Sequence, residues 1–242
     1  MLLEKDLTRV IAVSALTVIV VQTSCRKDAD EPSPTDFGFD FTPYEVGATW
    51  TYRVDSINYN SFDQNGSIDT FSFYVRKTVT DTIVDSDQRK TFIVSESRTD
   101  TLNDNFIQDR VYQASINDYR FEVVDSNVKV VLLTYSPRLF DFWDANVFNI
   151  RMKEEYEVID IVASDSVENM SFGETIHVLQ RDEDFRTVRN YGLEKYSRGV
   201  GLIYSRQIAW VKKTLNDPDE VQNGFDYRYQ LISFSKCFEQ RS

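Results

Sequence analysis

Cysteine and histidine are scarce in this chain of 242 residues, which holds two cysteines and one histidine. Two cysteines make neither a disulfide framework nor a four-ligand zinc site. Cys25 and Cys237 could form one disulfide; in the alternative, Cys25 is modified and Cys237 is a lone thiol. The histidine, His177, lies in the alternating stretch "ETIHVLQ". Because no triad or metal-binding partners can be assigned to it, we expect a structural strand histidine.

Glycine, proline and helical periodicity are also limited. The 8 Gly and 5 Pro exclude a low-complexity chain. No segment shows a long helical period with caps, and no repeat of fixed period is visible, so a propeller or a solenoid is not expected. Aromatic residues make up 14% of the chain, which is more than disordered chains contain. The chain is therefore expected to fold around a packed core.

Positive charge is in deficit, because 27 Lys and Arg face 39 Asp and Glu, for a net charge of −12. An acidic protein repels phosphate backbones, so nucleic acid is not an expected partner. It also repels anionic lipid, so adsorption to a membrane through a basic face is not expected.

The longest apolar run is "VIAVSALTVIVV", residues 10–21. It is shorter than the roughly 20 residues that span a bilayer, but it has the length of a signal-peptide core. The "QTSC" that follows resembles the lipobox of bacterial lipoproteins, although Gln22 replaces the usual leucine. This resemblance implies that residues 1–24 are a signal peptide, that cleavage precedes Cys25, and that Cys25 carries the lipid. The alternative is an ordinary secretory signal.

Residues 25–42 are predicted to be a flexible acidic linker, because "KDADEPSPTD" is charged and contains proline. The overlapping stretch "CRKDADE" (25–31) resembles the signal that directs lipoproteins of Bacteroidetes to the cell surface. Lys27 and Asp28 fit that pattern, whereas Ala29 interrupts its acidic pair. We therefore expect a lipid anchor in the outer membrane, with the protein at the cell surface or on the periplasmic face.

Residues 43–242 are predicted to form a single all-β domain. In residues 71–83, Phe71, Phe73, Val75, Val79 and Ile83 alternate with polar residues, as in a half-buried strand. About ten such strands, separated by turn signals, predict an antiparallel meander. The long strands favour a strongly curved sheet or open barrel, similar in architecture to LolA and LolB, over the alternative β-sandwich.

Two local features depart from this regular pattern. Trp50, Tyr52 and Val54 alternate, and then the apolar phase shifts to Ile57, which predicts a β-bulge at residues 55–56. The stretch "SPRLFDFWDANVF" is ambiguous and could hold one short helix.

Three stretches resemble a group of uncharacterised outer-membrane lipoproteins of Bacteroidetes. They are "YEVGATWTYRVDSINYN" (44–60), "WDANVFN" (143–149) and "EKYSRGVGLIYSR" (194–206). Arg206 departs from the glutamate that is common in this group. The resemblance implies an envelope location and an all-β fold, but it supplies no activity and no catalytic residue. Independently of the resemblance, Asp144, Asn146 and Asn149 are suited to bonding the backbone in turns.

Few side chains indicate chemistry. Trp50, Trp143 and Trp210 could stack on sugars or line an apolar cavity, although core packing is expected for most aromatic residues. The acidic clusters of residues 182–184 and 217–220 could bind calcium, but they lack EF-hand spacing and are typical of hairpin tips. Four Asp-Ser/Thr-aliphatic sequences resemble an O-glycosylation motif of Bacteroidetes, which makes the following residues candidate acceptors: Ser56, Thr82, Thr101 and Ser166.

These observations predict a non-catalytic binding or structural module, lipid-anchored to the cell envelope through Cys25, with no cofactor and with an unknown protein, glycan or lipid ligand. One alternative is a carrier of an apolar ligand in a cavity of the curved sheet. A third hypothesis is a hydrolase with paired carboxylates, whose pairing in space the sequence does not reveal.

Overall fold

The computed structural model describes residues 36–60, 67–84, 89–214 and 217–236, without the side chains of residues 67, 213–214 and 217–219. The predicted signal peptide, Cys25, most of the predicted linker and Cys237 lie outside the described residues. Within these ranges, no helix has the length and apolar character needed to cross a membrane.

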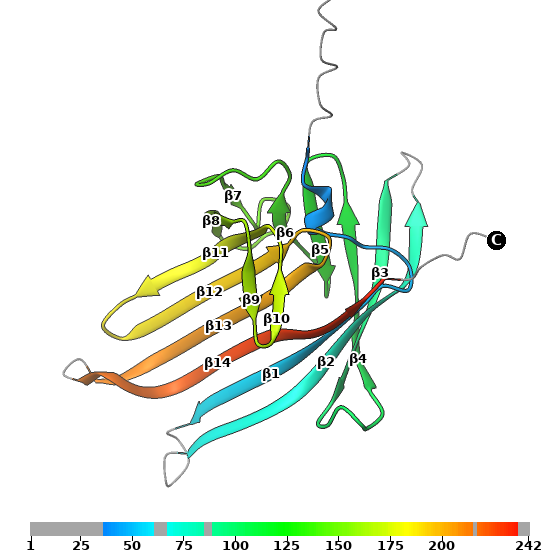
Figure 1. Cartoon of the computed structure of the whole chain (residues 1–242). Coiled ribbons are helices and arrows are strands. Elements are labelled where there is room, and N and C mark those ends of the chain that lie inside the picture. Colours follow the sequence, from blue (N-terminus) through cyan, green and yellow to red (C-terminus); the bar gives the residue numbers. More distant parts are fainter. Residues whose placement is uncertain (1–35, 61–66, 85–88, 215–216, 237–242) are drawn as a thin grey trace, which may run out of the picture. The chain divides into compact units, whose positions relative to one another are not determined.

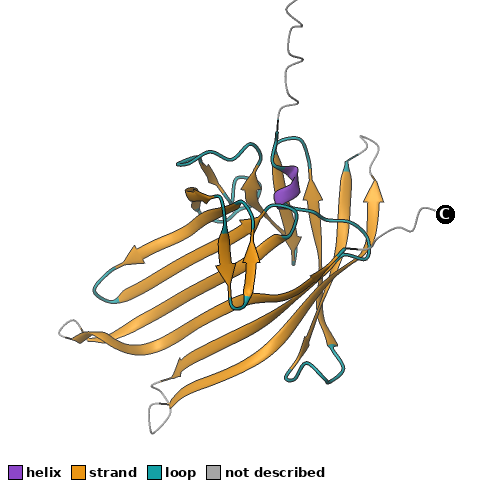
Figure 2. Ribbon diagram, viewed as in Figure 1, coloured by secondary structure: helices purple, strands orange, loops and turns teal. Residues whose placement is uncertain are grey.

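The fold is all-β, as predicted, and is dominated by one antiparallel sheet of twelve strands (Figures 1 and 2). The structure has more strands than predicted. Three of them, β7, β9 and β10, are each only three residues long, which is too short to show periodicity. The sheet consists of β1 (Thr49–Asn60), β2 (Ser67–Val84), β3 (Lys90–Thr99), β4 (Ile107–Ile116), β5 (Arg120–Asp125), β6 (Val128–Thr134), β7 (Phe142–Asp144), β8 (Glu155–Val162), β11 (Thr175–Asp184), β12 (Val188–Ser197), β13 (Gly201–Thr214) and β14 (Asp217–Ser235).

The sheet curves until its two edges meet. The strand order is β6-β5-β4-β3-β2-β1-β14-β13-β12-β11-β8-β7. The first and last strands of the chain, β1 and β14, therefore pair at the centre of the sheet. At the edges, Val131 of β6 donates to the carbonyl of Ala145 over 2.9 Å, just beyond β7. The Trp143 indole donates to the Val131 carbonyl over 2.9 Å. The result is a nearly closed barrel with a single seam between β6 and β7.

The predicted alternation of residues 71–83 is confirmed over the middle of β2, where Phe73, Val75 and Val79 are buried. Ile83 is exposed, because the β2–β3 register shifts between Val79 and Asp81 and reverses the inward phase. Lys77 occupies the inward position between Val75 and Val79, opposite Trp50.

The bulge predicted at residues 55–56 is wrong. β1 pairs with β2 without interruption through these residues, and its irregularity lies against β14, between Thr51 and Tyr52. The apparent change of phase has another cause: Ser56 continues the buried row of Tyr52 and Val54, while Ile57 lies on the other face. The helix considered for "SPRLFDFWDANVF" is also wrong, since this stretch forms turns and β7.

The chain before β1 forms a strap, residues 36–48, that crosses one end of the sheet. Ser136 donates to Phe37 O, Gly199 donates to Asp40 O, and Gly47 donates to Val79 O. The strap contains a 3-10 helix, Phe39–Phe41, whose Phe41 is 1% exposed. The packed part of the chain thus begins inside the stretch that the sequence assigned to the linker.

A separate hairpin, β9 (Asp165–Val167) and β10 (Met170–Phe172), packs against the main body with Val167 and Phe172 buried. Its Glu168 carboxylate lies 3.2 Å from the Arg53 guanidinium of β1.

Candidate functional site

Four charged side chains form a row on neighbouring strands β2 to β5. Lys77 Nζ lies 3.7 Å from Glu96 Oε2, and Arg110 donates to the two Glu96 oxygens over 3.0 and 3.1 Å. Arg110 also donates to Asp125 Oδ2 over 2.8 Å. Glu96 is buried, and burial of a charge is costly unless the charge is paired. An apolar residue would fill the Glu96 position at lower cost.

Glu194 of β12 borders the same hollow as Lys77 and Arg110. Burial raises the pKa of the Glu194 carboxyl above its ordinary value, although a hydrogen bond from the Tyr196 hydroxyl and the charge of Lys77 act in the opposite direction. Among the described residues, no basic side chain forms an ion pair with Glu194. The hollow is therefore bordered by two carboxylates, Asp125 and Glu194, and by two cations, Lys77 and Arg110, both of which contact Glu96.

Tyr44 of the strap inserts between the core aromatic side chains. Its ring centroid lies 5.1 Å from those of Trp50 and Phe121. Burial raises the pKa of the Tyr44 and Tyr112 hydroxyls, so both remain neutral hydrogen-bonding groups at physiological pH. Tyr44 borders two hollows, one inside the sheet and one beneath the strap.

The inner hollow has a volume of about 190 Å³ and is bordered by Lys77, Arg110, Glu194 and Tyr196 together with apolar side chains. Because a water molecule occupies about 30 Å³, this volume suits several waters or one small polar molecule. It is smaller than the roughly 300 Å³ at which pockets for larger organic ligands begin.

The outer hollow is a groove of about 920 Å³ between the strap and the ends of β3, β4 and β5. Phe39 and Tyr119 contribute exposed rings, and the Tyr119 side chain is 74% exposed. Asn117 Oδ1 accepts from the backbone of Tyr119 and Arg120, which fixes the β4–β5 turn. The Asn117 amide nitrogen donates no hydrogen bond within the described part of the chain and can reach a ligand.

His177 has partners that the sequence did not identify. His177 Nε2 lies 2.8 Å from Asp165 Oδ2 of the hairpin, and Lys195 Nζ lies 2.9 Å from the same oxygen. Burial alone would raise the pKa of Asp165, but the hydrogen bonds from Lys195, the Ser166 backbone and His177 hold it below its ordinary value. The cluster fastens the hairpin to the sheet, which fits the structural role expected for His177.

The structure places the three tryptophans outside both hollows. Trp50 is buried and donates to the Val200 carbonyl over 2.6 Å. Trp143 is half-buried at the seam, and Trp210 is half-buried with its ring centroid 5.8 Å from that of Tyr59. The aromatic side chains that line the groove include those of Phe39, Tyr44 and Tyr119. The sequence did not distinguish these residues from core aromatics.

The candidate glycosylation residues differ in accessibility. Ser56 is buried and Thr82 is half-buried, whereas Thr101 and Ser166 are exposed. Thr101 and Ser166 are thus the more accessible of the four candidate acceptors in the folded chain.

The carboxylates of residues 182–184 bind side chains of neighbouring strands. Asp182 accepts from Arg189, Glu183 from Asn190, and Asp184 from Lys212. The side chains of Asp217 and Asp219 lie outside the described residues.

Sequence reasoning missed the charged row, although a signal for it exists. Lys77 interrupts the apolar face of β2, and Glu96 continues the alternation of Phe92 and Val94 on β3. A charge at an inward position of an alternating strand is that signal. To recognise it, one must already know which residues of the strand point inward, and bulges make that assignment uncertain.

Comparison with known proteins gives little similarity. No protein-family model matches the chain, and no curated protein shows significant sequence similarity to it. A crystal structure of a candidate lipoprotein from Parabacteroides distasonis aligns with a TM-score of 0.41 at 12% sequence identity. The alignment covers 83% of this chain and 100% of that chain.

Proposed function

We propose that the protein is a non-catalytic binding module, lipid-anchored to the outer membrane through Cys25, and that its ligand lies in the groove beneath the strap. The groove carries this proposal, because its volume of about 920 Å³ lies within the range of ligand sites, roughly 300–1,000 Å³. The leader and the "QTSC" sequence support the anchor.

The groove chemistry favours an uncharged oligosaccharide. Two of its charges are already paired, since Asp40 lies 2.6 Å from Arg198 and Arg120 is paired with Glu122. Arg89 also lines the groove and has a partner of its own. The remaining Lys90 and Asp118 contribute opposite charges, so the groove does not select strongly for an ion. Exposed rings can stack on the apolar faces of sugars, while the Asn117 amide can bond their hydroxyl groups.

The curved, nearly closed sheet fits a carrier as well as a binding module, but the inner hollow favours neither a carrier nor a hydrolase. A carrier of apolar ligand requires a larger apolar cavity, whereas the inner hollow is small and is bordered by the charged side chains Lys77, Arg110, Asp125 and Glu194. For a hydrolase, the inward carboxylates Glu96 and Asp125 are both bound to Arg110.

The ligand assignment is tested with an array of neutral oligosaccharides. The purified chain is expected to bind a subset of them, and Tyr119→Ala should weaken that binding about tenfold, the effect of losing an anchoring aromatic side chain. Phe185→Ala is the control, because it removes a comparably exposed ring (63%) at the β11–β12 turn, outside the residues that line the groove. Binding only to peptides, or equal binding by Tyr119→Ala, would contradict the assignment.

The anchor is tested by mass spectrometry of the N-terminus of the protein isolated from membranes. An acylated Cys25 as the first residue is expected. An unmodified Cys25, or a different first residue, would exclude the lipid anchor.

A further inference from the structure

The connection from β6 to β8, here called the seam segment (residues 135–154), displays an unusual amount of apolar surface. Phe140 and Phe142 are each 66% exposed, Met152 is 89% exposed, and Ile150 is fully exposed. Isolated exposed apolar residues are ordinary, but a concentration within one short connection marks an interaction surface.

The backbone holds these side chains outward at a conformational cost. Phe140 adopts a φ of 70°, in the left-handed region that bulky residues avoid. Its N–H donates to Val158 O over 2.8 Å, which holds this conformation. Strain that the surrounding structure maintains is a feature of functional segments.

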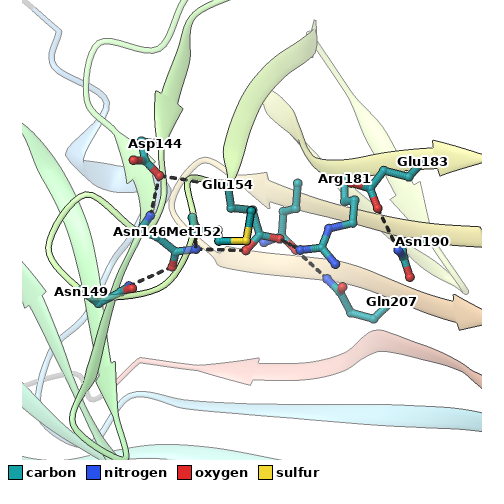
Figure 3. Close-up of polar contacts among 10 residues, drawn as sticks. Asp144, Asn146, Asn149, Met152, Glu154, Arg181, Glu183, Asn190 and Gln207 are labelled. Atoms are coloured by element: carbon teal, nitrogen blue, oxygen red, sulfur yellow. Dashed lines mark hydrogen bonds and ion pairs between the residues drawn. The ribbon is translucent and has the colours of Figure 1, made fainter.

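A polar scaffold fixes the remainder of the seam segment (Figure 3). Asp144 Oδ1 accepts from the backbone of Asn146 and Glu154 over 2.9 and 3.1 Å. Asn146 Nδ2 donates to Met152 O, and Asn149 Nδ2 donates to the Lys129 carbonyl. These contacts confirm the predicted turn-forming roles of Asp144, Asn146 and Asn149. Because the loop is already ordered, presenting Ile150 and Met152 to a partner costs little entropy.

Cations accompany the apolar side chains. Arg138 and Arg151 are exposed and form no ion pair within the described ranges. Arg151 lies between Ile150 and Met152 in the sequence "IRMK", and Arg138 precedes Leu139 and Phe140. Apolar side chains next to unpaired cations suit a lipid surface, where the apolar groups enter the acyl boundary and the cations meet lipid phosphates.

The chain connectivity brings the same segment close to the anchor. Ser136 N donates to Phe37 O over 2.6 Å, so the seam segment begins beside the first described residues of the fold. Eleven residue steps separate Cys25 from Asp36, and they cannot exceed about 40 Å in any conformation. An acylated Cys25 would therefore keep this end of the fold near the bilayer.

We propose that the seam segment is a membrane-contact surface, which lays Phe140, Phe142, Ile150 and Met152 on the lipid bilayer that holds the anchor. The orientation rests on the anchor proposed above, but the lipid affinity of the surface does not. Insertion of apolar groups drives the contact, which is compatible with the net charge of −12.

The test uses the full chain with Cys25→Ser, which cannot be acylated, and vesicles of phosphatidylethanolamine with a minor fraction of phosphatidylglycerol. Adding Ile150→Ser and Met152→Ser should lower the partition coefficient about tenfold or more, since each buried apolar side chain contributes about 1.5 kcal/mol or more. The leader is present in every chain compared, so only the difference between variants is interpreted.

The matched control adds Ile68→Ser and Ile107→Ser instead, which remove two isoleucines that are 64% and 75% exposed on β2 and β4. Partitioning of this control should equal that of the parent. Equal partitioning of the seam variant, or equal loss in the control, would overturn the proposal. A dimer detected by sedimentation without vesicles, and abolished by the seam substitutions, would overturn it in favour of a second copy. Mass spectrometry of Cys25 tests the anchor separately, because the vesicle result is obtained without acylation.

Discussion

At the scale of the residue, the interior charges are the least expected feature of this fold. Lys77 and Glu96 occupy inward positions on β2 and β3, where an apolar side chain would avoid desolvation, and the half-exposed Arg110 of β4 extends the row. Their mutual distances show that the row is paired, whereas Glu194 across the hollow has only hydrogen-bonding partners. The stability contribution of Glu194 is therefore expected to depend on pH.

Glu194→Gln should stabilise the folded chain at neutral and alkaline pH. Because burial raises the pKa of Glu194, the folded state binds this proton more tightly than the unfolded state. Stability consequently falls as the pH rises from the ordinary carboxyl value through the raised pKa, and the full loss is present above it. We expect Tm to rise by on the order of 2 °C at about pH 8 and to stay unchanged at about pH 4.

Thermal unfolding followed by circular dichroism at the two pH values measures this difference. Glu155→Gln is the control, because it removes an exposed carboxylate of β8 and should leave Tm unchanged at both. A Glu194→Gln variant that is less stable at about pH 8 would show that the charge, and not the neutral acid, stabilises the interior.

At the scale of the element, strand periodicity was a good guide until a register shift intervened. The inward row of β2 was predicted correctly from Phe73 to Val79, and it failed at Ile83, beyond the shift. In β1, the buried side chain of Ser56 made the apolar alternation look interrupted, although β1 pairs with β2 without a bulge there. Alternation identifies strands and faces, but it does not distinguish a bulge from a polar side chain on the inward face.

Gly224 fixes the close approach of β13 and β14. Its φ is 134°, and a Cβ added there would lie 1.9 Å from the Ala209 carbonyl oxygen. Gly224→Ala must separate the two backbones, so we expect a loss of about 3 kcal/mol in the free energy of unfolding, measured with urea.

Gly173→Ala is the matched control, because an added Cβ would meet no atom within 4 Å. Its free energy of unfolding should be unchanged or rise by less than about 1 kcal/mol. Similar losses for the two alanine variants would show that the effect does not come from the approach of β13 and β14.

At the scale of the whole molecule, the seam decides whether the curved sheet closes. The two edges are joined by the backbone bond from Val131 to Ala145 and by the Trp143 indole. Both contacts join residues only 12 to 14 positions apart, because β6 and β7 follow each other in the chain, although these two strands lie at opposite edges of the sheet.

Trp143→Phe should loosen the seam while keeping an aromatic ring in place. Loss of the indole donor is expected to cost about 1 kcal/mol and to speed hydrogen exchange of the Val131 amide about fivefold, with the β1–β14 amides unaffected. Trp210→Phe is the control, because the buried Trp210 indole nitrogen has no partner among the described residues. Unchanged exchange at Val131 in Trp143→Phe would mean that the backbone bond alone closes the seam.

The sequence by itself determined the all-β class and the strands of the long hairpins, and it predicts an exported, anchored protein. These are local properties: side-chain alternation, turn residues and an apolar run are encoded by neighbours in the chain. Only the tertiary structure decided that β1 pairs with β14, that the sheet closes at β6 and β7, and that Lys77, Arg110 and Glu194 share one hollow. Those features depend on register and curvature summed over the whole sheet, where a single bulge exchanges the two faces of every residue that follows.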